Sequence, residues 1–216
     1  TIVTQWHPIF LLPVSIAEPG RTTTMAYDER GNLLQKTIAA NSLSRNWTYT
    51  YNTVGQVLTA TGPLGDVTGY SYDAQGNLST ITNAMGHVTT LSNYDANGHV
   101  GRVVAPNGLV TTMTYSPRGW LLSRDVGGEV TTFTYDQVGQ MTSVRAPNGA
   151  LVSYTYNERR LRNITDGLGN SITYSLDAMG NRIRDQILDA SNAIVRQTDR
   201  QFDALGRLQR ITGGMQ

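Results

Sequence analysis

The stretch FTYDQVGQM, residues 133–141, decides the fold because close copies of it occur elsewhere in the chain. YSYDAQGNL at 70–78 and MTYSPRGWL at 113–121 keep the same order of an aromatic residue, Asp or Ser, and Gly. Self-similarity at a fixed spacing indicates an architecture in which one small unit stacks on its neighbours. The open question is whether the repeated Asp serves chemistry or architecture.

The phrase recurs with a period close to 21 residues. Successive steps measure 24, 21, 22, 21, 20, 21, 20 and 26 residues, and a second glycine, often within Asn-Gly, lies between most phrases. Each repeat therefore carries two turn signals with a short segment on either side. The phrases begin at Tyr27, Tyr51, Tyr72, Tyr94, Tyr115, Tyr135, Tyr156, Leu176 and Phe202, and the intervening glycines are Gly65, Gly86, Gly108, Gly128, Gly149 and Gly169.

The segments between the turns have the composition of strands. GLVTTMTY (108–115) and GEVTTFTY (128–135) are rich in Thr, Val and aromatic residues, which suit a pleated surface. Returning segments have apolar residues three apart, such as Leu78 and Ile81, which indicates a bulge or an early bend. No segment carries a helical stripe, so the sequence predicts an all-β fold. Alternation with period two places on one face the candidate aromatic contacts Tyr70, Tyr72, Phe133, Tyr135, Tyr154 and Tyr156.

The Asp and Gly of the phrase fit a type I turn. Such a turn favours Asp at its first position, where the side chain accepts a backbone hydrogen bond, and Gly at its fourth, where φ is positive. Asn52, Asn157 and Ser116 replace Asp in other copies, and none of them ionises, which argues against a catalytic carboxylate. The predicted structural turn residues are Asp28, Gly31, Asp73, Gly76, Asp95, Gly98, Asp136, Gly139, Asp177, Gly180, Asp203 and Gly206.

Composition excludes several classes of function. The 17 basic and 16 acidic residues leave a net charge of +1, which does not favour nucleic acid or an anionic membrane as a partner. The absence of Cys excludes disulfides, thiolate chemistry and Cys zinc sites, and it suits folding in a reducing cytosol. The longest apolar run, 9–14, is broken by Pro13 and is too short to span a bilayer.

Geometry predicts a ribbon. Nine repeats of two strands make about eighteen strands, and open sheets rarely exceed about ten without curling or splitting. We therefore expect a solenoid-like spiral, with lead-in strands at 1–26 and the array at 27–216. Because the chain opens without Met and ends in phase with the repeat, we expect it to be part of a longer wall.

The phrases YDERGNL, YDAQGNL, YDANGHV, YDQVGQM and FDALGRL resemble the YD repeats of the Rhs (rearrangement hotspot) family. QWHPIFLLPVSIAEPGRTTTMAYD (5–28) also resembles that family's lead into a repeat. The resemblance implies a β-sheet ribbon that forms part of a hollow shell. In bacterial members the shell encloses a C-terminal polymorphic toxin, delivered by a type VI secretion system or a toxin complex; related arrays occur in adhesion proteins, including animal teneurins. The family's self-cleaving aspartate region has no match in this chain.

The resemblance implies a structural wall segment for toxin encapsulation in bacterial competition. The implied partners are the rest of the same polypeptide, including further shell repeats and the toxin, together with secretion-spike and chaperone proteins. The implied location is the bacterial cytoplasm before export and then the secreted or delivered state. The alternative is a binding module at a cell surface that recognises glycans or a protein through its aromatic rows.

Chemistry-bearing motifs are scarce. His7, His87 and His99 lie in different repeats without metal-ligand spacing, and no nucleophile elbow, phosphate-binding loop or zinc-protease motif occurs. We therefore expect no enzyme, and no catalytic, cofactor-binding or metal-binding residue. An enzyme on a β-propeller, with 42-residue blades of two repeats, would need odd and even copies to differ, and they do not. The basic cluster 159–162 is interpreted as a solvated turn. Two departures from the repeat are interpreted as a change of curvature, a contact with a partner domain, or drift: the copy at 156–164, which is one residue short and lacks the turn Gly, and Arg182, which takes the position of the usual apolar Leu.

Overall fold

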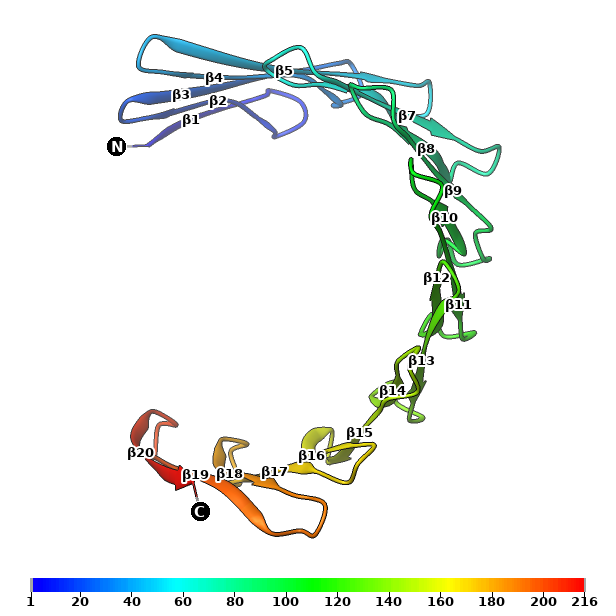
Figure 1. The fold of residues 1–216 in the computed structure, drawn as a ribbon. Coiled ribbons are helices and arrows are strands. Elements are labelled where there is room, and N and C mark those ends of the chain that lie inside the picture. Colours follow the sequence, from blue (N-terminus) through cyan, green and yellow to red (C-terminus); the bar gives the residue numbers. More distant parts are fainter. Residues whose placement is uncertain (1, 216) are drawn as a thin grey trace. The chain divides into compact units, whose positions relative to one another are not determined.

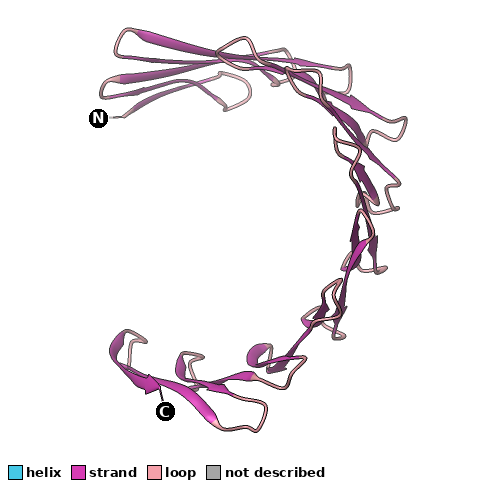
Figure 2. Cartoon of the chain, in the orientation of Figure 1, coloured by secondary structure: helices cyan, strands magenta, loops and turns pink. Residues whose placement is uncertain are grey.

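The computed structural model describes residues 2–215, and this part of the chain is built from strands and turns. It contains twenty strands and no helix (Figure 2). Every pairing found inside the two units described below is antiparallel and joins strands that follow each other in the chain. The all-β fold expected from the sequence is confirmed.

The first compact unit, Thr1–Val110, is a meander in which each strand pairs with the next (Figure 1). Its strands are β1 (Val3–Trp6), β2 (Pro13–Glu18), β3 (Arg21–Tyr27), β4 (Leu33–Ala40), β5 (Leu43–Tyr51), β6 (Val57–Thr61), β7 (Val67–Tyr72), β8 (Leu78–Thr82), β9 (Val88–Ser92) and β10 (Arg102–Val104).

The second unit, Thr111–Gln216, repeats this arrangement (Figure 1). Its strands are β11 (Val110–Tyr115, starting at the boundary), β12 (Leu121–Val126), β13 (Glu129–Tyr135), β14 (Met141–Arg145), β15 (Leu151–Asn157), β16 (Arg160–Asp166), β17 (Ser171–Leu176), β18 (Arg182–Leu188), β19 (Ile194–Phe202) and β20 (Leu208–Met215).

Each unit is a single layer without a hydrophobic core. Among the described residues no apolar side chain is buried, and Thr23 is the one buried polar residue. The chain exposes 14052 Å², whereas a compact protein of this mass would expose roughly 9,800 Å². Stability must therefore come from contacts between neighbouring strands, as in other repeat arrays, and both faces of the sheet remain open.

A β-bulge follows the YD turns other than the one between β9 and β10. In the β7–β8 hairpin Tyr72 pairs with Leu78 but Ser71 pairs with Thr80, so Ser79 is the extra residue. The Ser71 hydroxyl lies 2.7 Å from that of Ser79 and 2.6 Å from that of Thr80. Because one residue is skipped, apolar residues three apart come to lie on the same face. The bulge inferred from this spacing is confirmed.

The register divides each unit into two faces. On one face of unit 1, Tyr72 opposes Leu78 and Tyr70 opposes Ile81; on the same kind of face in unit 2, Tyr156 opposes Leu161. We call this the tyrosine face of each unit. The opposite side, the threonine face, carries small hydroxyl residues, in unit 2 for example Thr112, Thr114, Thr132 and Thr134.

Two kinds of turn account for most of the hairpins. Most are type I turns closed by a residue of positive φ, as at Asp73–Asn77, where the Gly76 amide donates to the Asp73 carbonyl. Three are two-residue turns with positive φ at both residues, Asn41–Ser42, Gly127–Gly128 and Glu158–Arg159, which is the type I′ geometry. The last of these explains the short copy at 156–164: the chain changes turn type there, and the paired strands continue.

The β9–β10 connection is irregular. Pairing stops at Ser92 and Arg102, and Asn93, the extra residue in the 22-residue step, has a φ of 57°. A Cβ at Gly101 would lie 2.3 Å from the Asn93 carbonyl oxygen, so this connection requires glycine at position 101.

Candidate functional site: tyrosine anchors, turn edge and an arginine cluster

The tyrosine of the YD phrase anchors its repeat to the preceding one. The Tyr72 hydroxyl donates to the Val57 carbonyl at 2.9 Å. The β6–β7 ladder ends at Thr59 and Gly69, so the Val57 carbonyl lies beyond the last strand pair and Tyr72 supplies the donor that the backbone does not. The same bond joins Tyr27 to Pro13, Tyr51 to Leu33, Tyr94 to Leu78, Tyr135 to Leu121 and Tyr156 to Met141, at 2.7–2.9 Å.

The anchor is lost in the last two copies. Leu176 and Phe202 take the place of tyrosine and have no hydroxyl to donate. The β16–β17 ladder nevertheless ends in the usual way, at Asn163 and Thr173. The repeats at the C-terminal end of unit 2 are therefore joined by ladder bonds and side-chain packing without this additional bond.

Burial favours the neutral form of four of the anchor hydroxyls. It raises the pKa of Tyr27, Tyr51, Tyr94 and Tyr156 above the ordinary value, because water is partly excluded from the phenol. These phenols therefore keep the donor proton at physiological pH, as an ordinary tyrosine does, and over a wider alkaline range. These tyrosines consequently act as hydrogen-bond donors within the sheet.

The YD aspartates accept the amides of their own turns. Asp73 Oδ1 accepts from the backbone amides of Gln75 at 3.0 Å and Asn77 at 2.8 Å, and Oδ2 accepts from the Asn77 side chain at 3.1 Å. Asn52 uses its amide oxygen for the same two backbone bonds, so the geometry needs an oxygen and no charge. Asp28, Asp95, Asp136, Asp177 and Asp203 accept equivalent backbone amides, and Gly31, Gly76, Gly98, Gly139, Gly180 and Gly206 have positive φ.

These hydrogen bonds stabilise the ionised aspartates. The side-chain amide of Asn77 is the largest cause that lowers the pKa of Asp73, and the asparagine after the turn acts in the same way on Asp28 and Asp177. For Asp95 and Asp203 the largest cause of the lowered pKa is the backbone amide of the residue after Gly. A carboxyl with a lowered pKa is a poor general acid or base at neutral pH.

The turns contact one another along one edge of each unit. Gln56, which follows the Gly of its turn, donates through Nε2 to the Gly76 carbonyl of the next YD turn at 2.7 Å. A Cβ at Gly139 would lie 2.8 Å from the Trp120 ring. Glycine is thus required at this position both by its φ and by the neighbouring turn.

The six candidate aromatic contacts lie on the tyrosine faces opposite aliphatic residues. Tyr70 opposes Ile81, Phe133 opposes Val144 and Tyr154 opposes Ile164. An aliphatic strand therefore separates the aromatic residues of one repeat from those of the next. The structure brings each pair together within its own strand, and a ligand-binding role for them stays a prediction.

The histidines have local partners. His7 stacks on Phe10 with ring centroids 4.7 Å apart, His87 Nδ1 lies 3.4 Å from the Asn83 side-chain nitrogen, and His99 Nδ1 lies 2.9 Å from Asp95 Oδ2. Within the described part of the chain, no three residues among His, Asp and Glu are grouped so that they could hold a metal ion. Across residues 2–215 the structure also has no helix with the length and apolarity of a membrane crossing.

Arg182, which stands out in the sequence at a usually apolar position, belongs to an arginine cluster on the tyrosine face of unit 2 whose other members were not predicted. Arg182, Arg196 and Arg200 surround Asp185 and line a depression of about 270 Å³ over β17–β19. The three-residue spacing caused by the bulge is the sequence signal that could have located this cluster. Arg182 and Asp185, three apart, occupy the two positions that Leu78 and Ile81 fill in β8. Applying that spacing to every copy would have placed both charges on the apolar face.

Comparison with known proteins shows where this architecture recurs. The Teneurin YD-shell family model matches residues 20–184, about three quarters of the chain. No curated protein matches the sequence.

Solved structures share the fold at low identity. Crystal structures of TcdB2-TccC3, with and without its hypervariable C-terminal region, each match with a TM-score of 0.71 at 16% identity, over 93–95% of this chain and 13% of that chain. The Photorhabdus luminescens Tc holotoxin pore matches with a TM-score of 0.64 at 16% identity, over 99% of this chain and 15% of that one. The chain thus spans about one seventh of the length of these structures.

Proposed function

The chain belongs to the Teneurin YD-shell family, and from this premise we propose that it is a wall segment of an Rhs-type shell that encloses a C-terminal toxin for bacterial competition. Its role in the wall is structural. Repeats joined by strand ladders and tyrosine anchors extend the sheet, and the turns form its edge. The aspartates and glycines of the YD phrase act as turn formers, and the chain divides into lead-in strands at 1–26 and the array at 27–216.

The observation that carries this proposal is the single-layer sheet. Each unit has one face of half-buried tyrosines and aliphatic residues and no buried apolar side chain among the described residues. A freely solvated sheet of this kind would expose large apolar areas, which monomeric proteins avoid. A wall that closes around its contents covers that face without requiring a second layer.

The proposed partners follow from the same premise. They are the remaining shell repeats and the toxin of the same polypeptide, together with secretion-spike and chaperone proteins. The protein would fold in the bacterial cytoplasm and then be secreted or delivered to a target cell, through a type VI secretion system or a toxin complex. No step of this role requires an active site in the chain, so we propose that the chain is not an enzyme.

Single-particle electron microscopy of the longest polypeptide that carries this sequence tests the proposal. The expected result is a closed shell in which residues 20–184 form part of the wall and density fills the interior. An array open to solvent on both faces, or a closed but empty shell, would contradict encapsulation.

A second candidate function is glycan binding at a cell surface. Unit 1 contains a depression of about 720 Å³ lined by polar groups of Asp73, Asn77, Thr90 and Asn93 beside Tyr94, and such groups next to a ring are what a sugar needs. A glycan array tests it with two kinds of variant. Thr90→Ala changes the lining of the depression, and Tyr70→Ala and Tyr154→Ala change the tyrosine faces at residues whose hydroxyls make no anchor bond. The absence of binding to any glycan would exclude this candidate.

A further inference from the structure

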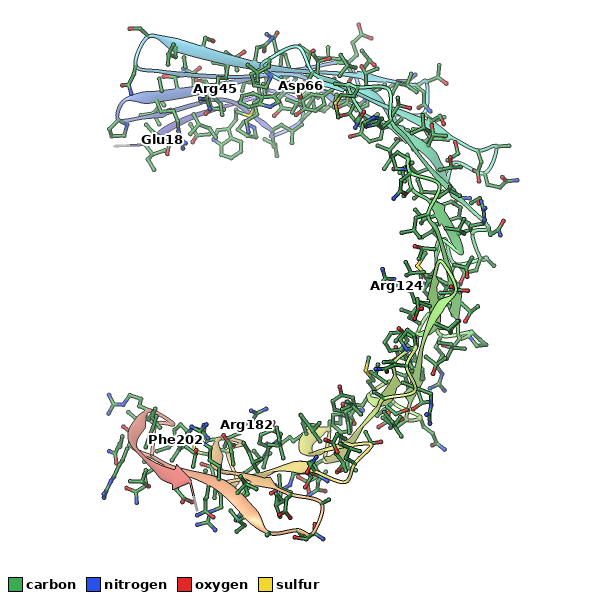
Figure 3. The ribbon with its side chains drawn as sticks, viewed as in Figure 1. Glu18, Arg45, Asp66, Arg124, Arg182 and Phe202 are labelled. Atoms are coloured by element: carbon green, nitrogen blue, oxygen red, sulfur yellow. The ribbon has the colours of Figure 1, made fainter. Side chains whose placement is uncertain are left out.

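The arginine cluster, defined as Arg182, Asp185, Arg196 and Arg200, places charged side chains at positions where other repeats carry apolar residues. In the register of β17–β19 Asp185 opposes Tyr174 and Thr198, and Ile187 opposes Ile172 and Arg196. All of these residues therefore lie on the tyrosine face of unit 2. Figure 3 shows Arg124 and Arg182 projecting from the same side of the unit 2 ribbon, in agreement with this assignment.

Its charges are not balanced. Three arginines surround one aspartate, which leaves two positive charges. Arg200 Nη1 lies 2.6 Å from Asp185 Oδ2, while the Arg182 guanidinium lies 4.0 Å above the Tyr174 ring. Arg196 forms no ion pair with any residue that the structure describes. Asp199, on the threonine face, is already paired with Arg184 at 2.5 Å.

Two shielded polar atoms of the cluster also form no hydrogen bond with a described residue. The Arg200–Asp185 contact is close but not aligned for a hydrogen bond, and Arg200 Nη1 and Asp185 Oδ1 are both shielded from solvent without a hydrogen-bond partner in the described chain. Shielded polar atoms are normally satisfied. One of these atoms needs an acceptor and the other needs a donor.

We propose that the arginine cluster binds an acidic residue of an extended polypeptide that lies on the tyrosine face of unit 2. The carboxylate accepts hydrogen bonds from Arg196 and Arg200, a backbone amide of the same segment donates to Asp185 Oδ1, and Ile172 and Ile187 contact the aliphatic part. An acidic residue in a peptide offers both an anion and a neighbouring N–H donor. A simple anion supplies acceptors alone and leaves Asp185 Oδ1 unsatisfied.

The size and the position of the depression support this occupant. A volume of about 270 Å³ accommodates one side chain. It opens on a sheet face, where a peptide approaches in extended form. Binding at this cluster requires the charges of unit 2 alone, so its test does not depend on whether the chain encloses a toxin.

Isothermal titration calorimetry with three probes tests the proposal: Ac-Val-Glu-Val-NH₂, Ac-Val-Gln-Val-NH₂ and glutarate. The Glu peptide should bind at least about tenfold more tightly than the Gln peptide, because charge-assisted hydrogen bonds are lost with the charge. Its affinity should decrease as salt is added. Glutarate should bind more weakly than the Glu peptide.

The variant pair Arg196→Gln and Arg124→Gln supplies a matched control. Both arginines are exposed and lie on the tyrosine face of unit 2, but Arg124 lies opposite Met113 and Thr131, outside the cluster. Arg196→Gln should weaken binding of the Glu peptide by about tenfold, and Arg124→Gln should leave it unchanged. Circular dichroism should show both variants folded, because neither side chain makes an ion pair with a described residue.

Three results would overturn the proposal. Equal binding of the Glu and Gln peptides, or no binding of either, would exclude a carboxylate site. Equal losses in the two variants would show general attraction to a basic face. If glutarate bound as tightly as the Glu peptide, the site would be one for free anions, and the proposed polypeptide ligand would be excluded.

Discussion

Removing one anchor hydroxyl should measurably weaken the junction between two repeats. Tyr72→Phe keeps the ring that opposes Leu78 but deletes the 2.9 Å bond to the Val57 carbonyl. A net loss of about 1 kcal/mol is expected for one neutral hydrogen bond. For a chain of this length, that corresponds to a decrease in Tm of about 2–4 °C.

Tyr70→Phe is the matched control, because Tyr70 lies on the same face of the same strand and its hydroxyl forms no hydrogen bond with a described residue. Thermal and urea unfolding give the global effect, and amide exchange locates it: protection should decrease at the β6–β7 junction and stay unchanged in β15–β16. The reciprocal variant, Leu176→Tyr, should stabilise the β16–β17 junction by a similar amount. Equal losses for Tyr72→Phe and Tyr70→Phe, or no loss for Tyr72→Phe, would refute the anchor.

Three further predictions follow from the turns and from the shifted pKa values. Replacing Glu158-Arg159 by Asn-Gly should raise the free energy of unfolding by about 1–2 kcal/mol, because Asn-Gly suits the type I′ turn and relieves positive φ at two ordinary residues. A lower free energy of unfolding, measured by urea denaturation, would contradict the assigned turn. Asp73→Asn should keep the turn but make the stability less sensitive to acid. The lowered pKa of Asp73 contributes stability that is present above the ordinary pKa of about 3.9 and is lost as the pH falls further. Tm should therefore fall less between pH 5 and 2 in this variant than in wild type, whereas Asp73→Ala should lower Tm at neutral pH. Tyr156→Phe should reduce alkaline sensitivity, because the raised pKa of Tyr156 contributes stability that is present below about pH 10 and is lost above it; an unchanged decline of Tm above pH 10 would show that its hydroxyl titrates as in the unfolded chain.

The strands, the YD turns and the bulge could be predicted because their causes are local. Asp73 reaches amides two and four residues away, and the three-residue spacing of Leu78 and Ile81 is visible in the sequence itself. A type I turn and a pleated strand are encoded within a few residues. A repeat that recurs nine times shows each of these signals several times over.

The anchors and the arginine cluster could not be read in the same way. The Tyr72 hydroxyl bonds a carbonyl 15 residues away, and only the folded hairpins show that Val57 lies beyond the end of its ladder. The sequence predicted aromatic residues on one face of alternate strands, but it did not show which backbone group each hydroxyl would reach. The type I′ turn at Glu158–Arg159 was also hidden, because neither residue favours positive φ.

Cysteine labelling measures most directly whether the tyrosine face is enclosed. The chain has no cysteine, so Thr131→Cys and Thr132→Cys introduce single thiols on adjacent residues of β13 that point to the tyrosine and threonine faces, respectively. In the 216-residue chain a large maleimide-polyethylene glycol should react with both. In the longest polypeptide that carries this sequence, the account predicts labelling at position 132 and protection at position 131 until the protein is unfolded; equal labelling of both positions in the folded protein would contradict an enclosing wall.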